Sequence, residues 1–376
     1  MNPALRCLAL VGGRLRRERL LLGFAGVALA LGLVDPAPWS RWSAWLQLPT
    51  LLGLFALLAS IEGIRASGAL QRAALALAQR ARTQRQLALQ LVFGAAFLSM
   101  WLTNDVSLFL VVPLTLALAR GAELPARRLV ILEALAVNAG STVSPFGNPQ
   151  NLWLWRASGE SMPQFAWQML PAAATMLALL GLTVWGLVPG RPLRVAAPAL
   201  AAPLHRGLGA AAGLLLATVL GLLQAGRAGV AALLALTLFA LAWRDVLRRV
   251  DWGLLGTLAA MFCGLGHLAQ WPPLHTLLLH LDWQRPSIAY VGGVLLSQCI
   301  SNVPASVLLW PQVGHATRLA VAVDVGGFGL ALGSLANLIA LRLEGGHGGL
   351  REFHRISVPF LLVCAPLVWM VQRLLG

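Results

Sequence analysis

The chain has 376 residues, of which 58% are hydrophobic and only 11% are charged. Soluble domains carry about a quarter charged residues, so this composition excludes a water-exposed globular protein and indicates a helical integral membrane protein. The chain has 28 arginines and no lysine, and its formal net charge is +15. Arginines in short loops between apolar segments set membrane topology, so nucleic acid is not an expected partner.

Residues 1–190 are expected to form the first of two repeated domains. A basic stretch, Arg14 to Arg19, precedes an apolar run that no small-residue cleavage site follows, so we interpret the run as a retained first span. The segment 66–85 is apolar but contains four arginines, which favours an interfacial helix. The expected elements are spans at 20–34 and 43–62, that interfacial helix, a hairpin at 86–119, a broken span at 124–156 and a closing span at 167–187.

Residues 191–376 are expected to repeat this order, with one additional span. The segment 272–283 is flanked by tryptophans and is expected to lie at the membrane interface. The expected elements are spans at 206–222, 226–243 and 252–270, the interfacial segment, a hairpin at 287–313, a broken span at 315–341 and a closing span at 355–372.

Four of these apolar segments are interrupted by polar or glycine-rich stretches, which are costly within lipid. The interruptions are at 103–105 and 301–302 in the hairpins, and at 138–150 and 324–334 in the broken spans. A constant offset of 186 aligns the two broken spans and pairs Gly140 with Gly326, Gly147 with Gly333, Asn151 with Asn337 and Leu152 with Leu338. Four identities can arise by chance in apolar sequence, but the common order of elements favours a true repeat.

The arginine distribution predicts the orientation. With a cytoplasmic N-terminus and two hairpins that each enter and leave on one side, all but six of the 28 arginines face the cytoplasm. The six on the other side are Arg41, Arg156, Arg227, Arg285, Arg318 and Arg373. The two halves are then inverted repeats. If each hairpin were instead a pair of full spans, the later loops would still lie on the same sides, so the arginine distribution does not distinguish the two topologies. The prediction of re-entrant hairpins rests only on the shortness of 86–102 and 104–119.

Inverted repeats with broken helices predict a binding site where the interruptions meet near the middle of the bilayer. Each break frees backbone groups that must face water, an ion or a substrate. We expect the coupling ion at Thr103, Asn104, Asp105, Asn138, Ser141, Thr142, Gly147 and Asn148. We expect the substrate at Ser144, Pro145, Ser301, Asn302, Asp324, Gly326, Gly327, Gly333, Ser334 and Asn337.

Each of these assignments has a structural alternative. Asp105 is either a proton carrier, as a carboxylate at mid-membrane depth suggests, or a cap on the helix that follows it. Glu133, inside an apolar run, is either a relay or the partner of a packed polar group. Serines, threonines and glycines in membrane helices also serve as packing residues. The four cysteines and seven histidines lack metal-ligand spacing, so no metal or other cofactor is expected.

Four motifs in this order resemble those of the ion transporter superfamily, specifically its citrate-transporter-like permeases, which include arsenite-efflux, sodium/proton antiporter and dicarboxylate carrier branches. The motifs are Trp101 to Val106, Asn138 to Leu152, Ser301 to Ala305 and Gly333 to Leu338. The resemblance implies an elevator mechanism, a coupling cation between each hairpin tip and the adjacent unwound loop, and a homodimer. Sodium-coupled dicarboxylate carriers have Ser-Asn-Thr at both tips, whereas here Asp105 and Val303 occupy the third positions, which favours proton coupling or cation exchange.

The sequence therefore predicts an all-α polytopic membrane protein with inverted repeats, two re-entrant hairpins and two broken transmembrane helices. Its predicted function is secondary active transport of a small anion, dicarboxylate, citrate-like or oxyanion, coupled to H⁺ or Na⁺, in a bacterial inner membrane. The alternatives are a cation/proton antiporter, an arsenite efflux permease and a channel. An enzyme is not expected, because no nucleophile elbow, phosphate-cradling loop or metal motif is present.

Overall fold

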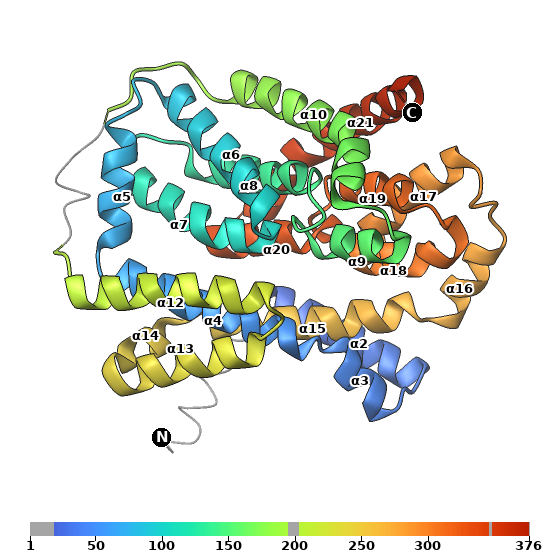
Figure 1. Cartoon of the computed structure of the whole chain (residues 1–376), viewed down its shortest axis with the longest axis horizontal. Coiled ribbons are helices and arrows are strands. Elements are labelled where there is room, and N and C mark those ends of the chain that lie inside the picture. Colours follow the sequence, from blue (N-terminus) through green and yellow to red (C-terminus); the bar gives the residue numbers. More distant parts are fainter. Residues whose placement is uncertain (1–18, 195–202, 346–347, 376) are drawn as a thin grey trace. The chain divides into compact units, whose positions relative to one another are not determined.

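The computed structural model describes residues 19–194, 203–345 and 348–375, and within these ranges every named element is a helix (Figure 1). The predicted all-α class is therefore confirmed. The basic stretch before the first span lies outside the described residues, except for Arg19, where the first helix begins. The chain divides into two compact units, and each takes segments from both halves of the sequence. The predicted repeats at 1–190 and 191–376 are a different division, and they stay a prediction.

The first unit comprises Met1–Gly63 and Ala210–Leu279. In it α2 packs along α15, and Phe55 of α4 stacks on Trp252 of α15. Gly63 leaves room for Ala212 and Phe239, which lets α4 approach α12 and α13 closely. The helices are α2(Arg19–Val34), α3(Trp39–Trp45), α4(Leu48–Ala66), α12(Arg206–Gln224), α13(Ala228–Ala242), α14(Arg244–Arg249), α15(Trp252–Ala269) and α16(Pro272–Leu279).

The second unit comprises Ile64–Gly209 and His280–Gly376 and contains every predicted site residue. Its centre is α8, which is buried from Leu129 to Ser141 because α6, α7, α10, α20 and α21 all pack against it. Figure 1 shows α6, α7 and α8 side by side. The helices are α5(Ala69–Ala78), α6(Gln84–Trp101), α7(Asn104–Gly121), α8(Ala126–Ser141), α9(Pro149–Ser158), α10(Met162–Leu187), α17(Pro286–Ile300), α18(Asn302–Val313), α19(Ala316–Val325), α20(Leu335–Glu344) and α21(Gly349–Leu375), with a 3₁₀ turn at η1(Ala331–Gly333).

Among the described residues, six helices are long and apolar enough to cross a membrane. They are Trp39–Ala66, Asn104–Gly121, Met162–Leu187, Arg206–Leu223, Trp252–Ala269 and Gly349–Leu374. The chain is thus a multi-pass membrane protein. One of the six is α7, whose 18 residues extend about 27 Å, close to the thickness of the hydrocarbon core. Helix length therefore does not decide whether the first hairpin is re-entrant, and re-entrance stays a prediction.

The two segments predicted to be interfacial contain helices too short to span a bilayer. The helix α5 has 10 residues and α16 has 8, whereas a span needs about 20. The helices α2 and α13, at two predicted spans, are also shorter than this, with 16 and 15 residues, so helix length does not test which apolar segments cross. The position of α5 and α16 at the membrane surface stays a prediction.

Candidate functional site

The first hairpin breaks where the sequence predicts. The helix α6 ends at Trp101 and α7 begins at Asn104, and Thr103 caps α7 by accepting a hydrogen bond from the backbone N–H of Val106. The backbone N–H of Asn104 donates to the carbonyl of Gly147 at 2.8 Å. The tip of this hairpin is thereby fixed against the unwound loop of the first broken span.

The second hairpin breaks at Ser301, between α17 and α18. Ser301 has φ 70° and ψ 155°, a backbone conformation that is essentially restricted to glycine. The amide nitrogen of Asn302 lies 3.3 Å from the position that a Cβ on Gly327 would take. This tip therefore lies against the loop of the second broken span, and a non-glycine residue at 327 would crowd it.

Both broken spans are interrupted, but later than the sequence predicts. The helix α8 continues to Ser141 and α19 to Val325, so Asn138, Ser141 and Asp324 lie in terminal helical turns and not in unwound backbone. The unwound stretches are 142–148 and 326–334, the latter containing η1. The apolar small residues before each break continue the helix, and the hydroxyls of Ser141 and Thr142 donate back to the carbonyl of Asn138.

Asn138 connects the first hairpin tip to the second broken span. Its Oδ1 accepts from Nδ2 of Asn104 at 3.3 Å and from Oγ of Ser334 at 3.0 Å. Its Nδ2 donates to Oδ1 of Asn337 at 3.1 Å and to the carbonyl of Gly327 at 3.4 Å. Because Asn138 is only 3% exposed, these four contacts satisfy a side chain that would otherwise be costly to bury.

Asp324 makes the matching connection to the first broken span. Its Oδ1 accepts from Nδ2 of Asn148 at 3.2 Å and from Nε2 of Gln150 at 3.0 Å. Its Oδ2 accepts from Nδ2 of Asn151 at 2.9 Å. The carboxylate is 2% exposed, and these three donors are neutral amides.

The contacts of Asn138 and Asp324 correspond to one another at the offset of 186 residues. Asn138 binds Asn337 while Asp324 binds Asn151, and Asn138 binds Ser334 while Asp324 binds Asn148. Ser334 and Asn148 are also the N-caps of α20 and α9. Each broken span therefore supplies one hub residue and one capping residue to the other, and we call this set the crossed network.

The two hairpins also meet the two broken spans in corresponding ways. A Cβ at Gly140 would lie 2.6 Å from Oγ of Ser99, and a Cβ at Gly326 would lie 2.6 Å from Oγ of Ser297. Ser99 and Ser297 each precede the tip asparagine by five residues. These glycines are packing positions that let α8 approach α6 and α19 approach α17, and contact with a ligand is not needed to explain them.

Asp105 lies in the first turn of α7 and is 7% exposed. Its backbone N–H donates to Oδ1 of Asn104, and its own Oδ1 is buried without a hydrogen-bond partner. Thr103 is the cap of α7, so capping does not account for Asp105. A buried carboxylate oxygen with no donor is rare in native structures, so Asp105 stands out from the other buried polar residues of the tip.

Glu133 lies on α8 and is fully buried. It accepts a short hydrogen bond from the hydroxyl of Thr115 on α7, and its Oε2 has no partner. Of the two alternatives for Glu133, the packed polar partner is the one the structure contains. A relay role is not tested by this contact.

Some predicted residues are less engaged than others. Ser144 accepts from the backbone N–H of Phe146 and so stabilises the loop itself, and no polar contact accompanies Pro145. Sequence reasoning left out Gln150 and Asn151, although the Asn151–Asn337 identity was a usable signal. It also left out Gln298, which donates to the carbonyl of Gly326 at 2.6 Å and accepts from the N–H of Leu330 at 2.7 Å.

The charge of the site is unusual for its predicted ligand. Within the described part of the chain, the donors to Asn138 and Asp324 are amides and hydroxyls, and no arginine or histidine bonds to either. Asp105 and Asp324 are the carboxylates of the site. The described residues contain no group of three or more histidine, cysteine, aspartate or glutamate side chains that could hold a metal ion.

Comparisons with known proteins show which sequences the chain is similar to. The family model described as citrate transporter matches residues 8–318. The chain is 39% identical over 348 residues to the inner membrane protein YbiR of Escherichia coli, covering 90% of this chain and 91% of that protein. It is 28% identical over 327 residues to an uncharacterized transporter of Methanocaldococcus jannaschii, covering 85% and 86%. A silicon efflux transporter of Oryza sativa subsp. japonica is 32% identical over 141 residues, covering 38% of this chain and 28% of that protein.

Proposed function

We propose the following function from the premise that the chain belongs to the citrate transporter family. The protein is a secondary active transporter that moves a small anion across the membrane, coupled to H⁺ or Na⁺. The crossed network carries this proposal, because it joins both broken spans and the first hairpin tip through buried polar side chains that packing alone does not require.

The coupling ion is proposed to bind between the first hairpin tip and the loop 142–148. The free Oδ1 of Asp105 and the bond from Asn104 to Gly147 support this position. A buried carboxylate without a cationic neighbour is strongly unfavourable, so a proton or a sodium ion supplies the missing positive charge. The substrate is proposed to bind beside it, at Ser301, Asn302 and the loop 326–334, with the bound cation compensating the charge of the anion.

An elevator mechanism is consistent with the division of the chain. Both hairpins and both broken spans belong to one compact unit, and an elevator requires the moving unit to carry the complete site. We include in this proposal the inverted repeats, the cytoplasmic N-terminus, the bacterial inner membrane and the homodimer that the resemblance implies.

A second candidate function is efflux of a small neutral hydroxylated acid, such as arsenous or silicic acid. One observation favours it: among the described residues, the hydrogen-bonded site combines amides, hydroxyls and the Asp324 carboxylate with no cationic side chain, which suits a neutral ligand rich in hydroxyl groups. The partial similarity to a silicon efflux transporter points the same way. A cation/proton antiporter remains the third candidate, because Asp105 and Asp324 can bind a cation without any second substrate.

Transport assays in proteoliposomes separate the three. Purified protein is tested with citrate, a dicarboxylate, phosphate, arsenite and silicic acid, each with imposed pH or sodium gradients. Gradient-dependent, saturable movement of an anion supports the first candidate, and movement of arsenite or silicic acid alone supports the second. Sodium movement against a proton gradient with no other solute supports the third, and unsaturable conductance contradicts all of them.

A further inference from the structure

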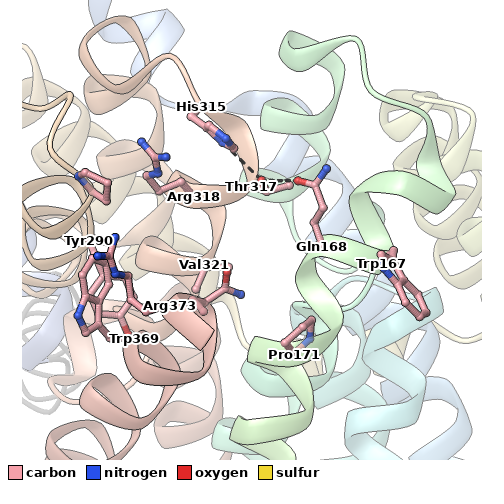
Figure 2. Close-up of a pocket in the computed structure, with 12 residues that line it drawn as sticks. Trp167, Gln168, Pro171, Tyr290, His315, Thr317, Arg318, Val321, Trp369 and Arg373 are labelled. Carbon is pink, nitrogen blue, oxygen red and sulfur yellow. Dashed lines mark hydrogen bonds between the residues drawn. The ribbon is translucent and has the colours of Figure 1, made fainter. Parts of the chain in front are cut away.

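The second unit contains a cavity that none of the residues of the crossed network lines. It has a volume of about 740 Å³ and is enclosed by α10, α17, α19 and α21 (Figure 2). The volume falls in the range of small-molecule pockets, about 300–1,000 Å³. None of the residues that line it was predicted from the sequence to bind a ligand.

The cavity lies where two helices begin and one ends. The helix α17 begins at Pro286 and α19 at Ala316, and both contribute their first turns to the lining. The helix α21 contributes its last turns, through Trp369 and Arg373. The N-terminal ends of α17 and α19 carry partial positive charge and the C-terminal end of α21 carries partial negative charge, so the helix ends together favour an anion only weakly.

Two arginines add full charges to this field. Figure 2 shows Arg318 of α19 and Arg373 of α21 on one side of the cavity, with Gln168 of α10 opposite. In the described part of the chain neither arginine forms an ion pair, although Arg373 lies 5.7 Å from the ring centroid of Trp369.

Two glutamine side chains also line the cavity. The amide nitrogen Nε2 of Gln372, another lining residue, is buried and has no partner. Across the cavity, the hydroxyl of Thr317 donates to Oε1 of Gln168 at 2.7 Å, which holds that amide in place. A buried donor without an acceptor is rare in native structures, but this nitrogen is not exposed to the cavity and would meet a ligand there only after the Gln372 side chain rotates.

The rim of the cavity is suited to lipid. Trp167 is 75% exposed, and exposed apolar side chains continue from it along α10 and α21. These are Leu170, Met370 and Leu374. Both helices are long and apolar, and only 28% of the most apolar stretch of α10 and 22% of that of α21 is buried within the protein. Their outer faces are therefore available to acyl chains. Tryptophan at helix ends is typical of the interface between hydrocarbon and headgroups.

We propose that this cavity binds the phosphodiester headgroup of an anionic phospholipid, held by Arg318 and Arg373, with the acyl chains along α10 and α21. A soluble anion would use the same positive groups, but it would have no use for the apolar rim. The proposal does not depend on the transported substrate.

The test measures lipid retention, which does not require transport. The purified full chain in mild detergent is mixed with equal amounts of phosphatidylglycerol and phosphatidylcholine of identical chains, and bound lipid is counted by native mass spectrometry. The wild type is expected to retain phosphatidylglycerol preferentially. Arg318→Gln and Arg373→Gln are each expected to lower that preference about five-fold, and the double variant about 25-fold.

Two controls make the outcome decisive. Arg156→Gln removes another exposed arginine of the same unit that does not line the cavity, and it should leave the preference within about two-fold. Arg318→Lys keeps the charge and should retain most of the preference, and melting curves establish that each variant is folded. An unchanged preference in the folded double variant overturns the proposal. Release of phosphatidylglycerol by excess inorganic phosphate, with phosphate adducts in its place, also overturns it in favour of a soluble-anion site.

Discussion

The substitution Asp324→Ala tests whether the crossed network stabilises the fold. It removes the acceptor of three buried amide donors, from Asn148, Gln150 and Asn151. A buried donor left without a partner costs about 1–3 kcal/mol, so three of them cost about 3–9 kcal/mol before any relaxation. Even the lower end is a large share of the 5–15 kcal/mol that typically separates folded from unfolded domains.

The substitution Asp324→Asn should lower the free energy of unfolding far less than Asp324→Ala. The reason is visible at Asn138, the corresponding hub of the crossed network. The amide oxygen of the new side chain can keep the bonds from Asn148 and Gln150, and its nitrogen then faces Asn151. The Oδ1 of Asn151 is buried without a partner, so turning that amide over supplies an acceptor. The result has the geometry of Asn138 with Asn337, and the expected cost is about 1–2 kcal/mol from replacing charged by neutral hydrogen bonds.

Thermal unfolding of the purified variants in one detergent measures this difference. Asp324→Ala is expected to melt several degrees below Asp324→Asn, and Asp324→Asn only slightly below wild type. Equal melting temperatures for the two variants would refute the reasoning, because they would mean that the three amides do not depend on an acceptor at position 324. Asp245→Ala is a suitable control, since that carboxylate forms only an exposed ion pair with Arg248.

Three further predictions concern the hairpin tips. Asp105→Asn should remove the pH dependence of transport in proteoliposomes, because it abolishes the buried group proposed to take up the proton. Asn104→Ala and Asn302→Ala should each lower uptake to background with normal expression, since both amides lie at the meeting point of a tip and a broken span. Ser301→Gly should raise the free energy of unfolding by about 1 kcal/mol, because it relieves a strain of about 1–3 kcal/mol and adds glycine's own entropic cost.

Each of these has a result that contradicts it. A pH profile for Asp105→Asn that coincides with the wild-type profile assigns proton coupling to another group. Normal uptake by either asparagine variant excludes that residue from the site. A Ser301→Gly protein that is less stable than wild type means that the hydroxyl contact with Asn302, or a bound ligand, outweighs the backbone strain.

The sequence was sufficient to predict the all-α class and the position of both hairpin breaks. Apolar runs of spanning length, bounded by arginines, indicated the helices of both units, and Thr103-Asn104 and Ser301-Asn302 marked two hairpin breaks that the structure contains. These features are local: capping residues and hydropathy act within a few positions of one another. The same locality explains the error at the broken spans, because small apolar residues around Asn138 keep the helix intact for one turn longer than polarity suggests.

The arrangement of the helices and the partners of the polar residues were not accessible in this way. The first unit joins segments more than a hundred residues apart, and the bonds of Asp324 reach back to residues 148–151. Gln150 carried no signal, since a single glutamine in a polar stretch has no periodicity to interpret. Asn151 did carry one, because its identity with Asn337 at the offset of 186 placed it in the pattern that the hydrogen bonds follow.

The difference between the two hubs bears on the coupling ion. Asn138 and Asp324 have nearly the same shape and corresponding partners, but only one of them is acidic. Amides at both hubs would leave the network neutral, so the carboxylate adds nothing to the geometry that Asn138 does not already provide.

What the carboxylate of Asp324 adds is charge. Together with Asp105 it gives the site two acidic groups, and no described basic side chain bonds to either. An uncompensated buried charge is destabilising, and this is the physical reason for proposing that a proton or a sodium ion binds at the site during the transport cycle. Of the parts of the proposed function, coupling to a cation is therefore the one that the charges of the site favour most directly.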